Sequence, residues 1–173
     1  MDIKLIALDV DGVLTDGKLL IGSNGIEYKS FNVKDGMAIS LARYTGIKIA
    51  FITGKKSDSV NIRSKELNVD FLYEGIRNKK EVLMNIVSTL NIQMKNVFYM
   101  GDDINDLTII HEVGFSAAPN DAVEIVRNSV HFVSKFKGGE GAVREVIDYI
   151  LSNQNNYKIL IDDYIANEMM ICQ

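Results

Sequence analysis

Short apolar runs, each typical of a buried strand, alternate along this chain with segments of helical periodicity. The clearest runs are Ile3–Leu8, Ile47–Ile52 and Asn96–Met100, and each is followed by residues typical of a turn. An alternation of strands and helices predicts a parallel sheet with helices on both faces. We therefore expect an α/β protein, and 173 residues are enough for one domain with a substantial core.

The predicted domain organisation has two parts. Residues 1–151 carry the strand and helix pattern, whereas residues 152–173 begin polar, become amphipathic and are expected to form a helical tail. Within the domain, residues 18–33 predict a β-hairpin directly after the first strand, with its turn at residues 22–25. The intervals between the turns that follow the strands leave no room for an inserted cap domain, so the substrate must be shielded in another way, such as by a neighbouring subunit. An open monomer that acts on a macromolecular phosphate is the alternative.

Composition narrows the possible partners and the location. The formal net charge of −4 argues against a nucleic-acid partner, because phosphate backbones require a basic surface. No apolar run approaches the roughly 18 residues of a membrane span, so membrane insertion is not expected. Cys172 is the one cysteine, which excludes an internal disulfide and suits a reducing cytoplasm.

An acidic stretch, Asp9–Gly17, follows the first strand immediately. Asp9 and Asp11 are two residues apart, so on an ideal strand they point to the same face. Two carboxylates held close together need a counter-charge, and oxygen ligands of this kind suit Mg²⁺. An acidic turn without chemistry is the alternative interpretation of this stretch alone.

Three further polar features also follow predicted strands, where the ligand site of an open α/β sheet lies. They are Thr53-Gly54, Lys79 and the segment from Gly101 to Asp106. Each has a purely structural alternative when it is taken alone. Together with Asp9 and Asp11 they offer carboxylates for a cation, a hydroxyl and N–H groups for phosphate oxygens, and an ammonium to balance charge. Phosphoryl transfer requires this combination.

These four motifs, in this order and at this spacing, resemble the signature of the haloacid dehalogenase (HAD) superfamily of phosphatases. The resemblance implies a Rossmann-like fold, catalysis through an aspartyl phosphate, and Mg²⁺. It makes Asp9 the nucleophile and Asp11 the general acid and then the general base. Thr53 and the Gly54 N–H would hold the phosphate, and Lys79 would neutralise charge between the nucleophile and the phosphate.

The same resemblance implies a metal site. The ligands would be the carboxylates of Asp9 and Asp102 and the backbone carbonyl oxygen of Asp11. Asp103 and Asp106 would orient the metal-bound water and Lys79, with a purely structural role as the alternative for Asp106.

A narrower resemblance is to the family of 3-deoxy-D-manno-octulosonate 8-phosphate (KDO 8-phosphate) phosphatases. The segments that carry it are 11–17, the hairpin, 31–36, 73–79 and 138–145. The resemblance implies a capless enzyme that releases KDO for lipopolysaccharide biosynthesis. It also implies a homotetramer in which the hairpins associate at the centre and a neighbouring subunit helps to close each active site.

Two basic residues are candidate substrate readers. Lys55 follows Gly54, where a cation could meet the carboxylate of a sugar acid, and Arg144 follows a glycine-rich loop. A basic residue at position 55 favours an eight-carbon sugar acid as the substrate, because the related phosphatases for nine-carbon sugar acids tend to carry an acidic residue there. The alternative for Lys55 is a solvated lysine without a role in binding. Two other functions stay open: a nonulosonate 9-phosphate phosphatase, and a noncatalytic HAD-like oligomerisation module associated with a sugar-nucleotide synthetase.

Overall fold

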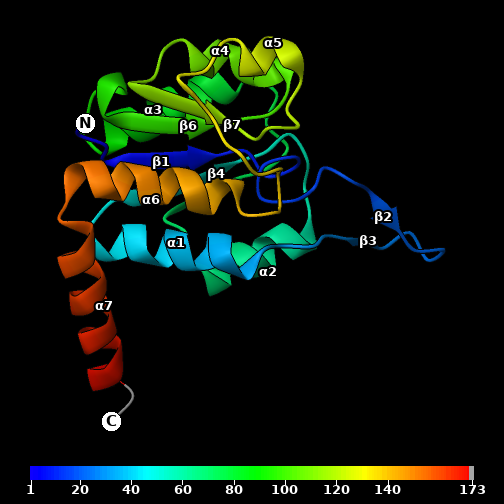
Figure 1. Ribbon diagram of the computed structural model, residues 1–173. Coiled ribbons are helices and arrows are strands. Elements are labelled where there is room, and N and C mark those ends of the chain that lie inside the picture. Colours follow the sequence, from blue (N-terminus) through cyan, green and yellow to red (C-terminus); the bar gives the residue numbers. More distant parts are fainter. Residues whose placement is uncertain (172–173) are drawn as a thin grey trace.

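A six-stranded parallel sheet forms the centre of the protein in a computed structural model, which describes the backbone of residues 1–171 and the side chains of residues 1–167 (Figure 1). The sheet order is β5-β4-β1-β6-β7-β8. The strands are β1 (Leu5–Leu8), β4 (Lys48–Ile52), β5 (Phe71–Tyr73), β6 (Val97–Met100), β7 (Phe115–Ala118) and β8 (Phe132–Val133). In the pairing of β1 with its two neighbours, Leu8 lies beside Phe51 and Met100, so the chain leaves these three strands at one common edge.

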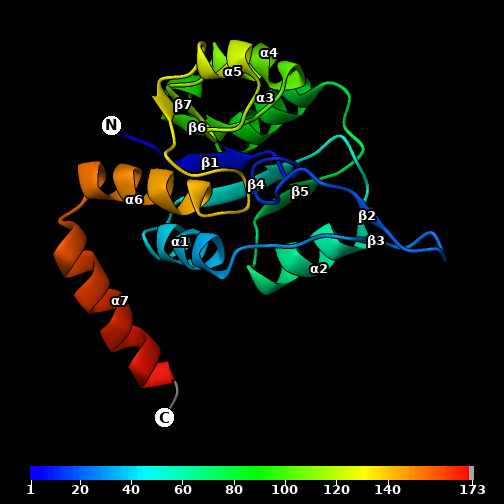
Figure 2. The ribbon, with the colours of Figure 1, turned by 45° about the vertical axis from the view of Figure 1, so that its right-hand side comes forward.

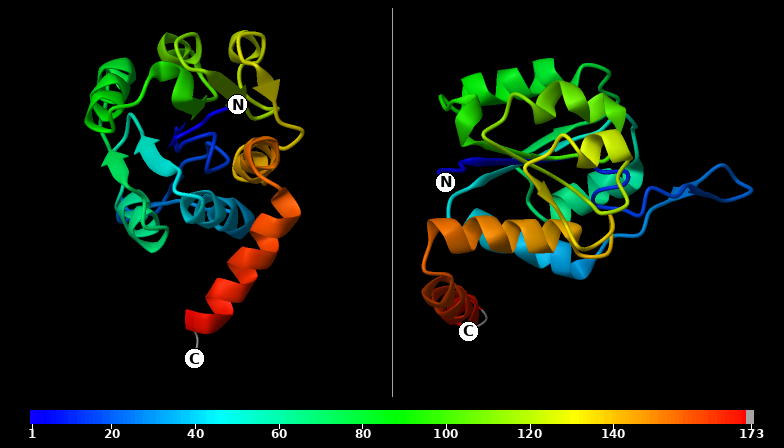
Figure 3. Two further views of the ribbon diagram at one scale, coloured as in Figure 1. Left: turned by 90° about the vertical axis from the view of Figure 1, so that its left-hand side faces the viewer. Right: turned by 45° about the horizontal axis from the view of Figure 1, so that its top comes forward.

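Helices cover both faces of this sheet, as the alternation of apolar runs predicts, and the α/β fold is confirmed (Figures 1 and 3). Ile6 and Leu8 of β1 face one core, whereas Leu5 and Ala7 face the other, in agreement with the two-residue period of a strand. The first core contains α1 (Val33–Tyr44), α2 (Asp58–Glu66) and α6 (Ala142–Gln154), and the second contains α3 (Lys79–Thr89), α4 (Leu107–Ile110) and α5 (Glu124–Arg127). Short 3₁₀ turns occupy Met94–Asn96 and Ile104–Asp106.

The hairpin is present, but its strands are shorter than the sequence pattern indicates. Only β2 (Leu20–Ile21) and β3 (Glu27–Tyr28) pair, antiparallel, and the hairpin extends away from the domain at the carboxyl end of β1 (Figure 1). The run of strand-like residues up to Val33 ends early because Asn32 caps α1: its side-chain oxygen accepts a hydrogen bond from the Lys34 N–H at 2.8 Å. The helix therefore begins at Val33, which the sequence pattern assigns to the hairpin.

The C-terminal segment is helical. Helix α6 (Ala142–Gln154) continues three residues beyond the expected domain boundary at residue 151, and α7 (Tyr157–Ile171) then runs away from the sheet (Figure 2). Leu160 is buried and joins α7 to the first core, and the Tyr164 ring meets the Tyr44 ring edge to face. Within the described part of the chain, no helix is both long and apolar enough to span a bilayer.

Candidate active site

A cavity of about 300 Å³ lies at the common edge where β1, β4 and β6 end. Its lining unites motifs that are far apart in the sequence, because the carboxyl ends of parallel strands share one edge of the sheet. The residues that line it are Asp9, Asp11, Gly17, Thr53, Gly54, Lys55, Asp102, Asp103 and Asn105. Of the predicted site residues, Lys79 and Asp106 are buried next to the cavity and do not line it, and Arg144 lies outside it; the structure brings the others together in the lining.

Lys79 is buried between two carboxylates. Its Nζ lies 2.7 Å from Asp9 Oδ2 and 2.8 Å from Asp106 Oδ1. Asn78 places Lys79 at the first position of α3, because the Asn78 side chain caps that helix by accepting from the Glu81 N–H. Burial lowers the pKa of Lys79, but the charges of Asp9 and Asp106 outweigh this effect and leave the pKa above its usual value. The ammonium therefore stays charged.

Asp106 organises the loop that follows β6. Its carboxylate is fully buried and accepts from Tyr99 Oη at 2.5 Å, from the Asp102 N–H at 3.0 Å and from the Asp103 N–H at 3.3 Å. Oδ1 accepts from Lys79 and Tyr99, whereas Oδ2 accepts from the two backbone N–H groups. Asp106 therefore fixes the position of Lys79 and the start of the loop that follows β6. Sequence reasoning missed Tyr99, because an aromatic residue in an apolar strand is ordinarily read as core.

Asp9 and Asp102 carry the electrostatic signature of a cation site. Burial, together with the charge of Asp106, raises the pKa of Asp9 to about 6 despite the opposing effect of Lys79. Burial and the charges of Asp9, Asp106 and Asp103 raise the pKa of Asp102 to about 8. One carboxylate oxygen from each of Asp9, Asp102 and Asp106 lies within 4.8 Å of the other two.

Such crowding of carboxylates is relieved by a divalent cation, and an all-oxygen donor set fits Mg²⁺. Asp106 is fully buried and does not line the cavity, whereas Asp9 and Asp102 do, so these two are the carboxylates that would hold the ion. Gly12 permits the close approach of its loop to Asp102, since a Cβ at Gly12 would lie 2.0 Å from Asp102 Oδ2. The Asp11 carboxylate points elsewhere and lies outside this cluster, which leaves its backbone carbonyl as the predicted ligand.

The phosphate-binding candidates follow β4. Thr53 is buried, and its Oγ1 accepts from the Lys55 N–H at 3.3 Å, which bends the chain at the cavity wall. The Lys55 ammonium is half exposed and pairs with Glu27 Oε2 of the hairpin at 2.5 Å. Two hairpin residues, Glu27 and Lys29, contact the cavity residues Lys55 and Asp11 and were missed, because no local pattern in the hairpin indicates these contacts.

Arg144 lies outside the cavity in this chain. Its guanidinium donates to Asp148 on the next turn of α6 at 2.6 Å, and its backbone N–H donates to Asp35 at 2.8 Å. The glycine-rich loop before Arg144 packs against the acidic stretch Asp9–Gly17: a Cβ at Gly138 would lie 1.9 Å from the Gly12 carbonyl oxygen. The glycines of that loop therefore serve a backbone contact within the domain.

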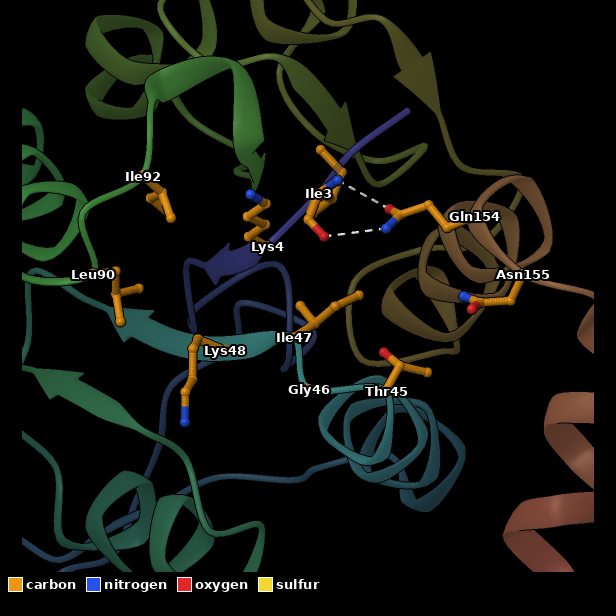
Figure 4. Close-up of a pocket in the computed structure, with 10 residues that line it drawn as sticks. All are labelled: Ile3, Lys4, Thr45, Gly46, Ile47, Lys48, Leu90, Ile92, Gln154 and Asn155. Carbon is orange, nitrogen blue, oxygen red and sulfur yellow. Dashed lines mark hydrogen bonds between the residues drawn. The ribbon is translucent and has the colours of Figure 1, made fainter.

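A second cavity, of about 310 Å³, lies at the opposite edge of the sheet, near the start of β1 and β4 (Figure 4). The backbone of Ile3 donates to and accepts from the Gln154 side-chain amide there, and Lys48 pairs with Asp70. Among the residues that line this cavity there is no carboxylate. The chemistry-bearing groups thus gather at the other edge.

Comparison with known proteins places this arrangement in a family. Residues 61–147 match the model of the haloacid dehalogenase-like hydrolases. The chain is 42% identical over 153 residues to 3-deoxy-D-manno-octulosonate 8-phosphate phosphatase KdsC of Escherichia coli (strain K12), an alignment that covers 88% of this chain and 81% of that protein. The corresponding enzyme of Yersinia pestis is 39% identical over 154 residues, with 89% and 82% covered.

Solved structures agree with these matches. The 3-deoxy-D-manno-octulosonate 8-phosphate phosphatase of Moraxella catarrhalis, in complex with a magnesium ion, a phosphate ion and KDO, superposes with a TM-score of 0.91 at 37% identity and covers 94% of each chain. The cobalt-bound phosphatase of Haemophilus influenzae gives a TM-score of 0.85 at 35% identity, with 88% of this chain and 90% of that chain covered.

Proposed function

Because the chain belongs to the haloacid dehalogenase-like hydrolase family, within the branch of the sugar-acid phosphatases, we propose that it hydrolyses 3-deoxy-D-manno-octulosonate 8-phosphate to KDO and phosphate. The observation that carries the proposal is the meeting of Asp9, Asp11, Thr53 and Asp102 in one cavity, with Lys79 paired to Asp9 beneath it. The relatives, which match over most of the chain, identify the substrate. This activity would supply KDO for lipopolysaccharide biosynthesis in the cytoplasm.

The first half of the reaction forms an aspartyl phosphate. A carboxylate oxygen of Asp9 attacks phosphorus, and the bond from phosphorus to the sugar oxygen breaks. Protonated Asp11 gives its proton to that leaving oxygen. In the second half a water attacks the phosphorus of the aspartyl phosphate, Asp11 takes the proton of the water, and the Asp9 carboxylate is regenerated.

Charge neutralisation supports both halves. The Lys79 ammonium, 2.7 Å from Asp9 Oδ2, keeps the nucleophile in position while an anionic substrate approaches. Thr53 and the Gly54 N–H would donate to phosphate oxygens. When Mg²⁺ is bound by Asp9 and Asp102, it offsets the negative charge that the phosphate brings to this acidic cavity.

Lys55 is the proposed reader of the sugar-acid carboxylate. It lines the cavity next to Gly54, and its ammonium is held by Glu27 at the mouth. A basic residue at this position favours KDO 8-phosphate over a nonulosonate 9-phosphate, because the related nine-carbon phosphatases tend to carry an acidic residue there. The alternative of a noncatalytic oligomerisation module is disfavoured. Such a module does not need a buried Lys79 between Asp9 and Asp106, nor a neighbouring Asp102 whose pKa is raised.

The substrate proposal predicts a ranked phosphate-release assay. With Mg²⁺ present, kcat/KM for KDO 8-phosphate should exceed that for glucose 6-phosphate by at least about 10-fold, since glucose 6-phosphate lacks the carboxylate that Lys55 would pair. A nonulosonate 9-phosphate keeps the carboxylate on a chain one carbon longer, which changes the separation of carboxylate and phosphate, and its kcat/KM should also be at least about 10-fold lower. Chelation of the metal should remove the activity. Equal rates on all three substrates would reduce the proposal to a general phosphatase.

The hairpin supports a proposed homotetramer. Large apolar side chains cover it and are about half exposed or more in the single chain: Leu19, Leu20, Ile21, Ile26 and Tyr28. A two-stranded hairpin with such a surface is marginal in water and favours burial against further copies. Light scattering should give a molar mass of four chains, and a substitution of Leu20 and Ile21 by Ser should lower it; a monomeric wild type would contradict the assembly.

A further inference from the structure

A chain of alternating charges connects the hairpin to the catalytic cavity. The Lys29 ammonium is bound to the Asp11 carboxylate and lies 2.9 Å from Glu27 Oε1, whereas the other oxygen of Glu27 binds Lys55 at 2.5 Å. Glu27, at the start of β3, and Lys29, just beyond its end, are two residues apart, so both side chains lie on the same side of the hairpin and contact cavity residues, whereas Tyr28 between them is exposed.

Lys29 is the buried member of this chain. Its side chain is only 2% exposed, against 28% for Asp11 and 47% for Lys55. A buried ammonium is costly unless it is paired, and Lys29 has two carboxylates. Burial lowers its pKa, but the hydrogen bonds to Asp11 and Glu27 raise it above the usual value, so the group remains an ammonium.

The Asp11 side chain depends on this contact for its direction. Asp11 lies in a turn three residues beyond β1, not in a strand that would fix it. Within the described part of the chain, Lys29 is the one side chain that donates a hydrogen bond to its carboxylate. An unanchored Asp side chain samples several rotamers, and misplacement by about 1 Å can cost about 100-fold in rate.

We propose that Lys29, held by Glu27, is a positioning residue that aims the Asp11 carboxyl group at the leaving oxygen of the substrate. The inference rests on the proposed phosphatase function and assigns to the hairpin a part in the chemistry. The contact persists when Asp11 is protonated, because a carboxyl group still has an acceptor oxygen for the ammonium. In the step that it serves, the Asp11 O–H bond breaks, the sugar O–H bond forms, and the electrons of the P–O bond stay on the sugar oxygen.

The test compares two leaving groups. The sugar alkoxide of KDO 8-phosphate requires a proton as it departs, whereas the 4-nitrophenolate of 4-nitrophenyl phosphate departs without one. Because kcat/KM covers the steps up to leaving-group release, Lys29→Met should lower it by about 10- to 100-fold for KDO 8-phosphate and by less than about 3-fold for 4-nitrophenyl phosphate. Lys29→Arg, which keeps a charged donor, should recover most of the loss.

The controls separate positioning from a structural role. Lys34→Met removes an exposed lysine just beyond the hairpin and should change neither rate. Glu27→Gln leaves the ammonium in place but weakens its anchor, and should lower the ratio of the two kcat/KM values about 3-fold or more. An equal loss on both substrates in folded Lys29→Met, or an unchanged ratio in folded Glu27→Gln, would overturn the inference. A wild-type protein without phosphatase activity would instead overturn the proposed function.

Discussion

Asp9→Asn is expected to reduce phosphate release by at least about 10⁴-fold, because the amide oxygen is a poor nucleophile towards phosphorus. Asn has nearly the same shape as Asp, so the fold should survive. The amide oxygen of this variant can still accept a hydrogen bond from Lys79, whose second partner, Asp106, is unchanged. The measurement is kcat with KDO 8-phosphate and Mg²⁺, accompanied by the thermal unfolding midpoint of each protein.

A matched variant makes the loss specific. Asp162→Asn removes an exposed carboxylate on α7 and should leave kcat unchanged. Incubation with substrate followed by acid quench and mass analysis should find a covalent phosphate, about 80 Da, on the wild type and none on Asp9→Asn. Turnover by Asp9→Asn near the wild-type rate would remove Asp9 from the nucleophile role and, with it, the proposed mechanism.

Much of the site can be predicted from the sequence, because a parallel sheet brings the residues that follow its strands together at one edge. The apolar run before Asp9, the run before Thr53 and the run before Gly101 each indicate a strand by local pattern alone. Once these runs pair in parallel, their carboxyl ends share one edge, so residues far apart in the sequence become neighbours. No knowledge of individual side-chain contacts is needed for that step.

The parts that escaped prediction depend on non-local contacts of single residues. Lys29 contacts Asp11, 18 residues earlier, because the hairpin turns the chain back towards the acidic stretch. The alternation of residue types within the hairpin does not predict this contact. Likewise, the loop at Gly138 closes on Gly12 from the far end of the domain, and no local pattern encodes that contact. The expected hairpin extends to Val33, where α1 begins instead for a local reason, since the cap at Asn32 competes with strand propensity.

Lys79→Met should produce the second large effect, a loss of both activity and stability. The variant leaves Asp9 and Asp106 buried without their shared counter-charge, because the Lys79 side chain is 2% exposed and contacts both. Removal of one partner from a buried ion pair typically costs about 3–5 kcal/mol, which for a chain of this length lowers the unfolding midpoint by about 10 °C. The rate should fall by about 10³-fold or more, as the nucleophile loses its anchor and the phosphate loses a counter-charge.

The neighbouring lysine provides the control for this experiment. Lys80 forms an ion pair with Glu112 at 2.7 Å, but both side chains are more than one-third exposed. Such a surface pair contributes about 0–1 kcal/mol, so Lys80→Met should change the midpoint by at most about 3 °C and leave kcat intact. If Lys79→Met matched Lys80→Met in both measurements, the buried pair would be neither a stabilising nor a catalytic element. A loss of activity without a loss of stability would show that Asp9 and Asp106 take up protons in the variant at little cost in folding free energy. The pKa of Asp9 is already raised to about 6, so protonation of this carboxylate requires less free energy than that of an ordinary aspartate.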